Sequence, residues 1–208
     1  MTKLYLISSL RIDTVRDLAN ELRELGFDVF DDWHAAGPQA DDIWRDYEKQ
    51  RGRTYLEALQ GHHAKHVFAL DEKHLAESDV AVLLLPAGKS GHLELGIHLG
   101  KGKPGYILLD EPDRWDVMYQ FATGVFAEKE KLFSELQGIL ETRQSRNGSE
   151  AADLRDLASK IEEVSRDHPA QSMVSELVQA FSGSLHLKAR VIDYQSQLSP
   201  RKEDGSAL

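Results

Sequence analysis

Apolar residues in the first part of the chain gather in short runs that alternate with segments of helical periodicity. Four runs have the length and composition of β-strands, and they lie at residues 4–7, 27–30, 79–85 and 106–109. The run at 79–85 is the most apolar and is typical of a central parallel strand that is covered on both faces. The pattern therefore predicts a sheet whose strands are connected by helices.

The segments between these runs carry helix signals. Residues 13–26 place four apolar side chains on one face, with Asp13 as the predicted cap and Gly26 as the stop. A loop is predicted at 31–38, and further helices are predicted at 41–60, 71–78 and 92–100. Strands that alternate with helices indicate a doubly wound α/β fold with a mainly parallel sheet, of the Rossmann or flavodoxin-like type.

Beyond residue 128 only helical periodicity remains. The predicted organisation is an α/β domain, a polar linker, a helical extension and a disordered tail, at 1–141, 142–149, 150–199 and 200–208. The extension has two apolar helical faces, one containing Leu157 and the other Phe181. These faces predict a helical hairpin that turns at His168 and Pro169.

The composition narrows the possible function classes. Asp and Glu number 35 against 25 Lys and Arg, a formal net charge of -10, so the chain lacks the basic surface that binding to long nucleic acids requires. The absence of cysteine excludes disulfides, thiolate metal sites and cysteine nucleophiles. The first apolar run is too short for a signal peptide, and no run approaches the length of a membrane span. We expect a soluble, cytoplasmic protein.

The predicted topology locates a binding site before any chemistry is considered. In a doubly wound sheet, ligands bind beyond the carboxyl ends of the strands, so residues 8–11, 31–33 and 88–94 should meet there. Residues 88–90 read Gly-Lys-Ser, but a nucleotide-binding P-loop would also need a glycine at position 83, which is leucine. Two interpretations remain for this segment: an anion-binding turn at a helix start, and a plain connection.

Glu94 follows this turn by one helical turn and lies between two leucines. A carboxylate with apolar neighbours at a ligand site is suited to act as a nucleophile or base, although a first-turn glutamate also complements the helix dipole. Trp33 belongs either to the core or to a site where it stacks on a base. Glu94 and His98 have the spacing of metal ligands, but no metal motif supports them, so no metal site is predicted.

Three segments together carry a family resemblance: residues 71–82 (DEKHLAESDVAV), 91–96 (GHLELG) and 102–104 (GKP). They resemble the nucleoside 2-deoxyribosyltransferase family and the related deoxynucleoside-monophosphate N-glycosidases, over roughly residues 3–126. The resemblance implies that Glu94 is the nucleophile at C1' of a deoxyribose and that Asp71 interacts with the nucleobase. Tyr5 matches the transferases and is expected to orient Glu94.

The resemblance also implies which residues bind the substrate. Residues 5–11 (YLISSLR) are similar to the phosphate-binding element of the monophosphate hydrolases, and residues 116–118 to the element by which a neighbouring subunit completes the transferase pocket. A further base-site acid of the family corresponds to a glycine here, so Asp31 or Asp32 would replace it. The implied substrate-binding residues are Ser8, Ser9, Arg11, Asp31, Trp33, Gly88, Ser90, Gly91, Asp116 and Met118.

The resulting prediction is cleavage of the N-glycosidic bond of a 2'-deoxyribonucleoside or its 5'-monophosphate through a covalent Glu94–deoxyribose ester. Transfer to another base and transfer to water both stay open, as does a salt bridge of Arg11 with Asp13 in place of phosphate binding. No cofactor is expected, and the chain would act in nucleotide salvage as a homo-oligomer. The alternatives are an NAD-cleaving enzyme of TIR-like architecture and a catalytically inert nucleotide-binding or sensing module.

Overall fold

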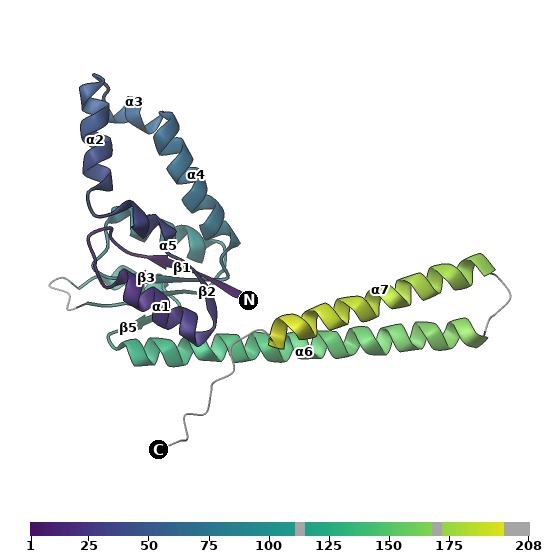
Figure 1. Ribbon diagram of the computed structural model, residues 1–208. Coiled ribbons are helices and arrows are strands. Elements are labelled where there is room, and N and C mark those ends of the chain that lie inside the picture. The colour runs from purple at the N-terminus through teal and green to yellow at the C-terminus, as the bar shows by residue number, and fades with distance from the viewer. Residues whose placement is uncertain (111–114, 168–171, 198–208) are drawn as a thin grey trace, which may run out of the picture. The chain divides into compact units, whose positions relative to one another are not determined.

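The computed structural model describes residues 1–110, 115–167 and 172–197 (Figure 1). A five-stranded, all-parallel sheet has the strand order β2-β1-β3-β4-β5. Its strands are β1 (Thr2–Ile7), β2 (Phe27–Phe30), β3 (Val80–Leu84), β4 (Gly105–Leu108) and β5 (Gly124–Phe126). This order confirms the predicted doubly wound, flavodoxin-like α/β fold.

Helices connect the strands and follow the last one. They are α1 (Val15–Leu25), α2 (Ala40–Gln50), α3 (Tyr55–Leu59), α4 (His62–Glu77), α5 (Lys89–Gly100), α6 (Lys129–Asp167) and α7 (Ser172–Gln197), with 3-10 helices η1 (Asp32–Ala36) and η2 (Val117–Phe121). Figure 1 shows α4 and α5 on one face of the sheet and α1 on the other. No described helix is both long enough and apolar enough to cross a membrane.

The four predicted strands are present, with bounds within two residues of those expected. The sequence pattern did not predict β5, because a strand of only three residues offers too few positions to show a period. The cap of α1 is also different: Thr14 is the N-cap residue and makes no side-chain cap bond, so the prediction for Asp13 was wrong. Gly26 ends α1 as predicted, with a φ of 112° that favours glycine.

The helix predicted at 41–60 is two helices, α2 and α3, because the chain turns between them. Gly52 has a φ of 72°, which a helix cannot contain. Thr54 and Glu57 then form a capping box that starts α3. Glu48 is buried and its carboxylate lies 3.0 Å from Nη1 of Arg53, which ties the turn to α2. The helix predicted at 71–78 is the C-terminal half of the longer α4.

Residues 142–149 do not form a linker, because they are helical and lie within the 39-residue helix α6. The polar composition of this stretch reflects an exposed helix. A single interior glycine, Gly148, costs only about 1 kcal/mol relative to alanine and does not end a helix. The chain divides into two compact units, Thr2–Glu135 and the part from Leu136 onward, and α6 runs through that division.

The predicted pair of C-terminal helices is present, and α6 and α7 contact each other mainly through small side chains. Oγ of Ser182 lies 3.1 Å from the carbonyl oxygen of Ala158, and Arg155 forms an ion pair with Asp193. Beyond residue 136, the buried side chains among those whose burial the structure describes are Ala151, Ala158, Ser182, Leu185 and Ala189.

Some larger apolar side chains of the described part of the hairpin are exposed. Leu157 and Phe181, predicted on the packed faces, are 46% and 57% exposed. The periodicity assigned these faces correctly as apolar, but close packing of two helices favours small residues at the contact. The predicted turn at His168 and Pro169 and the predicted tail at 200–208 lie outside the described residues.

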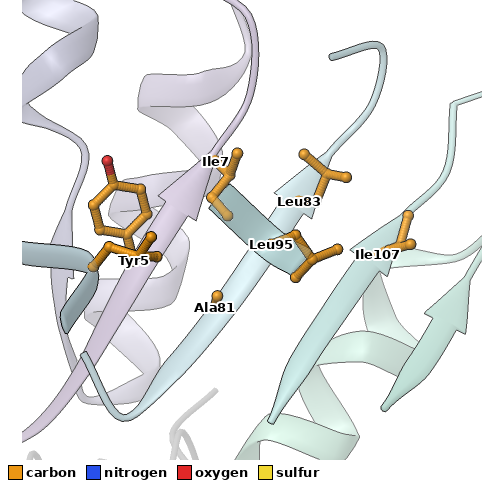
Figure 2. Packing of buried hydrophobic residues seen from close by; sticks show 7 residues of the cluster. Tyr5, Ile7, Ala81, Leu83, Leu95 and Ile107 are labelled. Atoms are coloured by element: carbon orange, nitrogen blue, oxygen red, sulfur yellow. The ribbon is translucent and has the colours of Figure 1, made fainter. Parts of the chain in front are cut away.

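One layer of the core of the first unit lies between the sheet and the helices α4 and α5. Figure 2 shows Ile7, Leu83 and Ile107 on one face of three neighbouring strands, with Leu95 of α5 packed over them. Tyr5 is buried on the same face of β1 as Ile7, because side chains two positions apart in a strand point the same way. The fold thus places a tyrosine hydroxyl inside an apolar layer beneath α4 and α5.

Gly91 allows α5 to approach the sheet. A Cβ atom at this position would lie 2.9 Å from Cγ2 of Ile7 and 3.2 Å from Cδ1 of Leu83. These distances are shorter than normal carbon–carbon contacts, so a larger residue would push α5 away from β1 and β3. Gly91 therefore sets the depth at which α5 packs.

We expect Gly91→Ala to lower the free energy of unfolding by about 1–3 kcal/mol, because the added methyl group overpacks the core. Gly96→Ala on the same helix is the matched control, since no heavy atom lies within 4 Å of its added Cβ. Alanine there should leave stability unchanged or raise it, since it is the better helix former. Urea unfolding of both variants measures the difference, and equal stabilities would contradict the packing argument.

Candidate active site

Three titratable side chains from three different elements, two carboxyl groups and one phenol, interact electrostatically in the first unit. Tyr5 lies on β1, Asp71 on α4 and Glu94 on α5. Burial, followed by the charges of Glu94 and Asp71, raises the pKa of Tyr5. The charge of Asp71 also raises the pKa of Glu94. The structure therefore brings together all three residues that the sequence predicted to be catalytic.

Packing of the neighbouring residues explains how these side chains meet. Leu75 lies one turn after Asp71 on α4 and is buried in the same core cluster as Tyr5. Leu95, the residue after Glu94, is buried in that cluster as well. The strand order places β1 beside β3, at the point where the sheet's winding direction reverses. In folds of this type, the crevice at this point binds ligands.

The two carboxyl groups are difficult to ionise together. Burial, and then the charge of Asp71, raises the pKa of Glu94 to about 7. Burial raises the pKa of Asp71 too, and nearby His74 partly opposes this. Oδ1 of Asp71 is buried without a hydrogen-bond partner in the described part of the chain. A pair that holds one proton near neutral pH can supply an acid and a base in the same site.

Aromatic rings border this group, and sequence analysis did not identify them. The rings of Phe30 and His74 stack with centroids 3.8 Å apart, and the ring of Phe30 lies 5.1 Å from that of Tyr5. Phe30 ends a strand at the predicted crevice, and His74 lies one helical turn after Asp71. Their positions in the sequence could therefore have placed both rings near the predicted site. Phe30 thus adjoins Tyr5, and His74 acts electrostatically on Asp71.

The predicted turn at residues 88–90 leads into α5, with Gly88 as the N-cap residue. The helix begins at Lys89, three residues earlier than predicted. His92 Nδ1 donates to the carbonyl oxygen of Gly88 at 2.8 Å, and its Nε2 accepts from the hydroxyl of Tyr119 at 3.0 Å. Ser90 is exposed on the first turn of α5. Sequence analysis did not single out His92 or Tyr119.

The predicted phosphate-binding residues have partners within the protein. Oγ of Ser8 donates to the carbonyl oxygen of Leu84 at 3.0 Å, and Oγ of Ser9 accepts from the backbone N–H of Arg11 at 3.3 Å. The guanidinium of Arg11 lies 3.2 Å from a carboxylate oxygen of Asp42 on α2. Arg11 therefore pairs with Asp42, whereas the sequence had suggested Asp13.

Asp31 and Trp33, at the end of β2, are similarly engaged. Asp31 forms an ion pair with Arg23 of α1, which compensates its charge. The indole N–H of Trp33 donates to the carbonyl oxygen of Leu6 at 2.8 Å, which fixes the ring beside the end of β1. The described contacts do not join either side chain to Glu94. Their predicted roles at the base site stay predictions.

Asp116 and Met118 lie at η2, after the carboxyl end of β4. Oδ1 of Asp116 accepts from the backbone N–H of Met118 at 3.0 Å and caps this short helix. The side chain of Met118 is 57% exposed. No described contact links these two residues to Tyr5, Asp71 or Glu94 of the same chain.

Two cavities open elsewhere on the first unit. One of about 750 Å³ is lined by Gly96, Gly100 and Phe121, among other residues. Another of about 380 Å³ lies between α2 and α3, around Trp44 and Glu48. Glu94 lines neither cavity. The interaction of the ionisable groups therefore defines the candidate active site, which does not coincide with either cavity.

The described residues contain no cluster of three His, Asp or Glu side chains that could hold a metal ion. His98 is buried, and its Nε2 donates to the carbonyl oxygen of Pro104 at 3.1 Å. Burial and the neighbouring Lys103 lower the pKa of His98, which favours the neutral imidazole. His98 thus has a packing role on the buried side of α5.

Comparison with known proteins identifies no relative. Neither a scan against protein-family models nor a search of curated proteins gives a match. The functional interpretation therefore depends on the residues of this chain and on the geometry in which the fold places them.

The raised pKa of Glu94 predicts a pH-dependent gain in stability for Glu94→Gln. In the folded protein the pKa of Glu94 is about 7, against 4.5 for the free group, so the folded form binds the proton more tightly. The wild-type protein therefore loses stability as the pH rises from about 5 through about 7. We expect the variant to melt about 3–6 °C higher than the wild type at pH 8.

This difference should shrink toward pH 5, where Glu94 is protonated in the folded protein. Differential scanning calorimetry between pH 5 and pH 8 measures it. Glu24→Gln is the control, because Glu24 is exposed and should give a difference from the wild type that does not change over this range. A constant difference for Glu94→Gln would contradict the burial of its charge.

Proposed function

We propose that this protein cleaves the N-glycosidic bond of 2'-deoxyribonucleosides or their 5'-monophosphates through a covalent ester between Glu94 and C1' of the sugar. The observation that carries the proposal is the interaction of Glu94 with Asp71 and Tyr5, with the pKa of Glu94 raised to about 7. A pair of carboxyl groups with shifted pKa values is the arrangement that glycoside cleavage requires. The resemblance in residues 71–82 and 91–96 supplies the substrate class.

In the first step, the carboxylate of Glu94 attacks C1' while the bond between C1' and the base nitrogen breaks. In the reactive form, Glu94 is ionised and the proton that the pair shares lies on Asp71. The electron pair of the broken bond leaves with the base, and Asp71 donates that proton to it. In the second step, water or another base attacks C1' and displaces Glu94. Asp71 then accepts the proton from the incoming group, so the protein returns to its starting state.

Tyr5 contributes as a neutral hydrogen-bond donor in this proposal. Its raised pKa keeps the phenol protonated at any physiological pH. A protonated phenol close to Glu94 can donate to the carboxylate and orient it toward C1'. The carboxylate of Glu94 would otherwise be desolvated without a fixed direction.

A homo-oligomer is part of this proposal. Several large apolar side chains of α5 and η2 are at least half exposed in the single chain. They are Leu93, Ile97, Val117, Met118 and Phe121. Asp116 and Met118 make no described contact with the acidic group of their own chain. A second chain that covers this surface could receive these residues at its own site.

We expect Glu94→Gln to lower the rate of base release at least about 10³-fold, because an amide cannot act as the nucleophile. The test incubates each deoxynucleoside and each 5'-monophosphate, with and without a free acceptor base, and quantifies bases by chromatography. Glu24→Gln should retain full activity. Exchange of bases would identify a transferase, and release into water a hydrolase.

Other outcomes of the same assay would overturn the proposal. Release of nicotinamide from NAD alone would favour the TIR-like alternative. Binding of nucleotides without turnover of any substrate would favour the inert sensing module. Full activity of Glu94→Gln on deoxynucleosides would contradict the nucleophilic role even if the substrate class were right.

The carboxyl pair predicts a maximum in the pH dependence of kcat/KM. The active form holds one proton between Asp71 and Glu94, so activity falls at low pH, where both are protonated, and falls above about 7, where the pair loses its last proton. Asp71→Asn should abolish the fall at high pH and move the rise to lower pH, because the charge that raises the pKa of Glu94 is gone. An unchanged profile in this variant would contradict the coupling.

A further inference from the structure

We propose that the hydrogen bond between Tyr119 and His92 is a positioning contact that holds η2 against the first turn of α5 and thereby sets the affinity of the active site for its substrate. This inference depends on the proposed function, because it concerns the substrate of the same site. It assigns a role to two residues that neither the sequence motifs nor the proposed mechanism uses.

The contact has a defined geometry. The hydroxyl of Tyr119 donates to Nε2 of His92 at 3.0 Å, and Nδ1 of His92 donates to the carbonyl oxygen of Gly88 at 2.8 Å. The two rings stack with an interplanar angle of 18° and centroids 5.8 Å apart. Nδ1 carries a proton, because a carbonyl oxygen can only accept, and in the neutral imidazole Nε2 is then the acceptor for the phenol. Burial and the charge of Asp116 raise the pKa of Tyr119, which keeps the phenol a donor.

The contact joins two segments at the edge of the sheet where ligands bind. Gly88 belongs to the turn after the carboxyl end of β3, and η2 follows the carboxyl end of β4. The side chain of Tyr119 packs against the core cluster, as does that of Ala122 just after η2. Val117, Met118 and Phe121 of the same segment are each more than half exposed. Among the described contacts, the bond from Tyr119 is a side-chain hydrogen bond that links η2 to α5.

The position of His92 separates this contact from the chemical step. His92 precedes Glu94 by two residues, so the two side chains leave α5 in nearly opposite directions. Glu94 interacts with Tyr5 and Asp71, whereas His92 contacts η2. Loss of the contact should therefore let η2 shift at the edge of the sheet where ligands bind, and leave Glu94, Asp71 and Tyr5 in place.

The test measures kcat and KM for base release in the wild type, Tyr119→Phe, His92→Phe and the double variant. Both single variants keep a ring at the stack and lose the hydrogen bond between Tyr119 and His92, and His92→Phe also loses the bond from Nδ1 to the carbonyl oxygen of Gly88. We expect KM to rise about five- to tenfold in each, with kcat within about twofold of the wild type. The double variant should resemble His92→Phe, because the bond between Tyr119 and His92 cannot be lost twice.

Tyr106→Phe is the matched control. The hydroxyl of Tyr106 lies 3.4 Å from Oε1 of Glu135, so this variant also loses a phenol interaction, but on β4 and away from η2. It should leave KM and kcat unchanged. An unchanged KM in Tyr119→Phe, a fall in kcat alone, or equal effects of Tyr119→Phe and Tyr106→Phe would overturn the positioning role.

A second measurement separates failure of this inference from failure of the proposed function. The ¹⁵N shifts of the His92 ring, assigned by their loss in His92→Phe, should show the Nδ1–H tautomer in the wild type, and Tyr119→Phe should keep this tautomer but change the shift of Nε2, which loses its hydrogen bond. A wild type with this tautomer but no turnover would overturn the proposed function and the substrate role with it. An active wild type without this tautomer would overturn the positioning contact alone.

Discussion

The helix α5 can lie against β1 and β3 only because residue 91 carries no side chain. Cγ2 of Ile7 and Cδ1 of Leu83 occupy the space that a Cβ there would need. From this close approach follow the burial of Leu95 in the core and the placement of Glu94 beside Tyr5. The same packing fixes the first turn of α5, where His92 meets Tyr119. The absence of a side chain at Gly91 thus sets where α5 places both Glu94 and His92.

Burial of the acidic group has opposite consequences for the stability of the fold and for the proposed chemistry. Charged carboxylates at Glu94 and Asp71 lose solvation and repel each other, so the folded protein favours a state in which the pair retains a proton. Such an arrangement destabilises the fold at high pH but keeps both an acid and a base available at neutral pH. Packing residues alone would not create this property. It arises from the meeting of three titratable side chains within one apolar layer.

Several residues expected at the ligand are engaged by partners within the chain. Arg11 pairs with Asp42, and Asp31 pairs with Arg23. The pair of Arg11 lies largely in solvent, where ion pairs contribute little free energy, so an anionic ligand could replace Asp42 at small cost. Asp31 is more enclosed, and its pairing with Arg23 fixes the end of β2 to α1. A ligand could therefore displace the partner of Arg11 more readily than the partner of Asp31.

The sequence by itself determined the elements with strong local signals. The apolar runs of β1 to β4, the stop at Gly26 and the alternation that indicates a parallel α/β fold all appear in the order of residues. It also indicated Glu94, Asp71 and Tyr5, because their segments carry a family resemblance. The break at Gly52, the three-residue strand β5 and the helical course of residues 142–149 were missed, since composition does not distinguish an exposed helix from a linker and short elements show no period.

Only the tertiary structure decided which side chains meet. The raised pKa of Glu94 depends on Asp71 and on burial by segments distant in sequence, and no local pattern encodes that desolvation. The partners of Arg11 and Asp31, and the contact of His92 with Tyr119, likewise join residues that are far apart along the chain. Periodicity reports the face on which a residue lies. The charge, solvation and hydrogen bonding of that residue are set by whatever the fold packs against it.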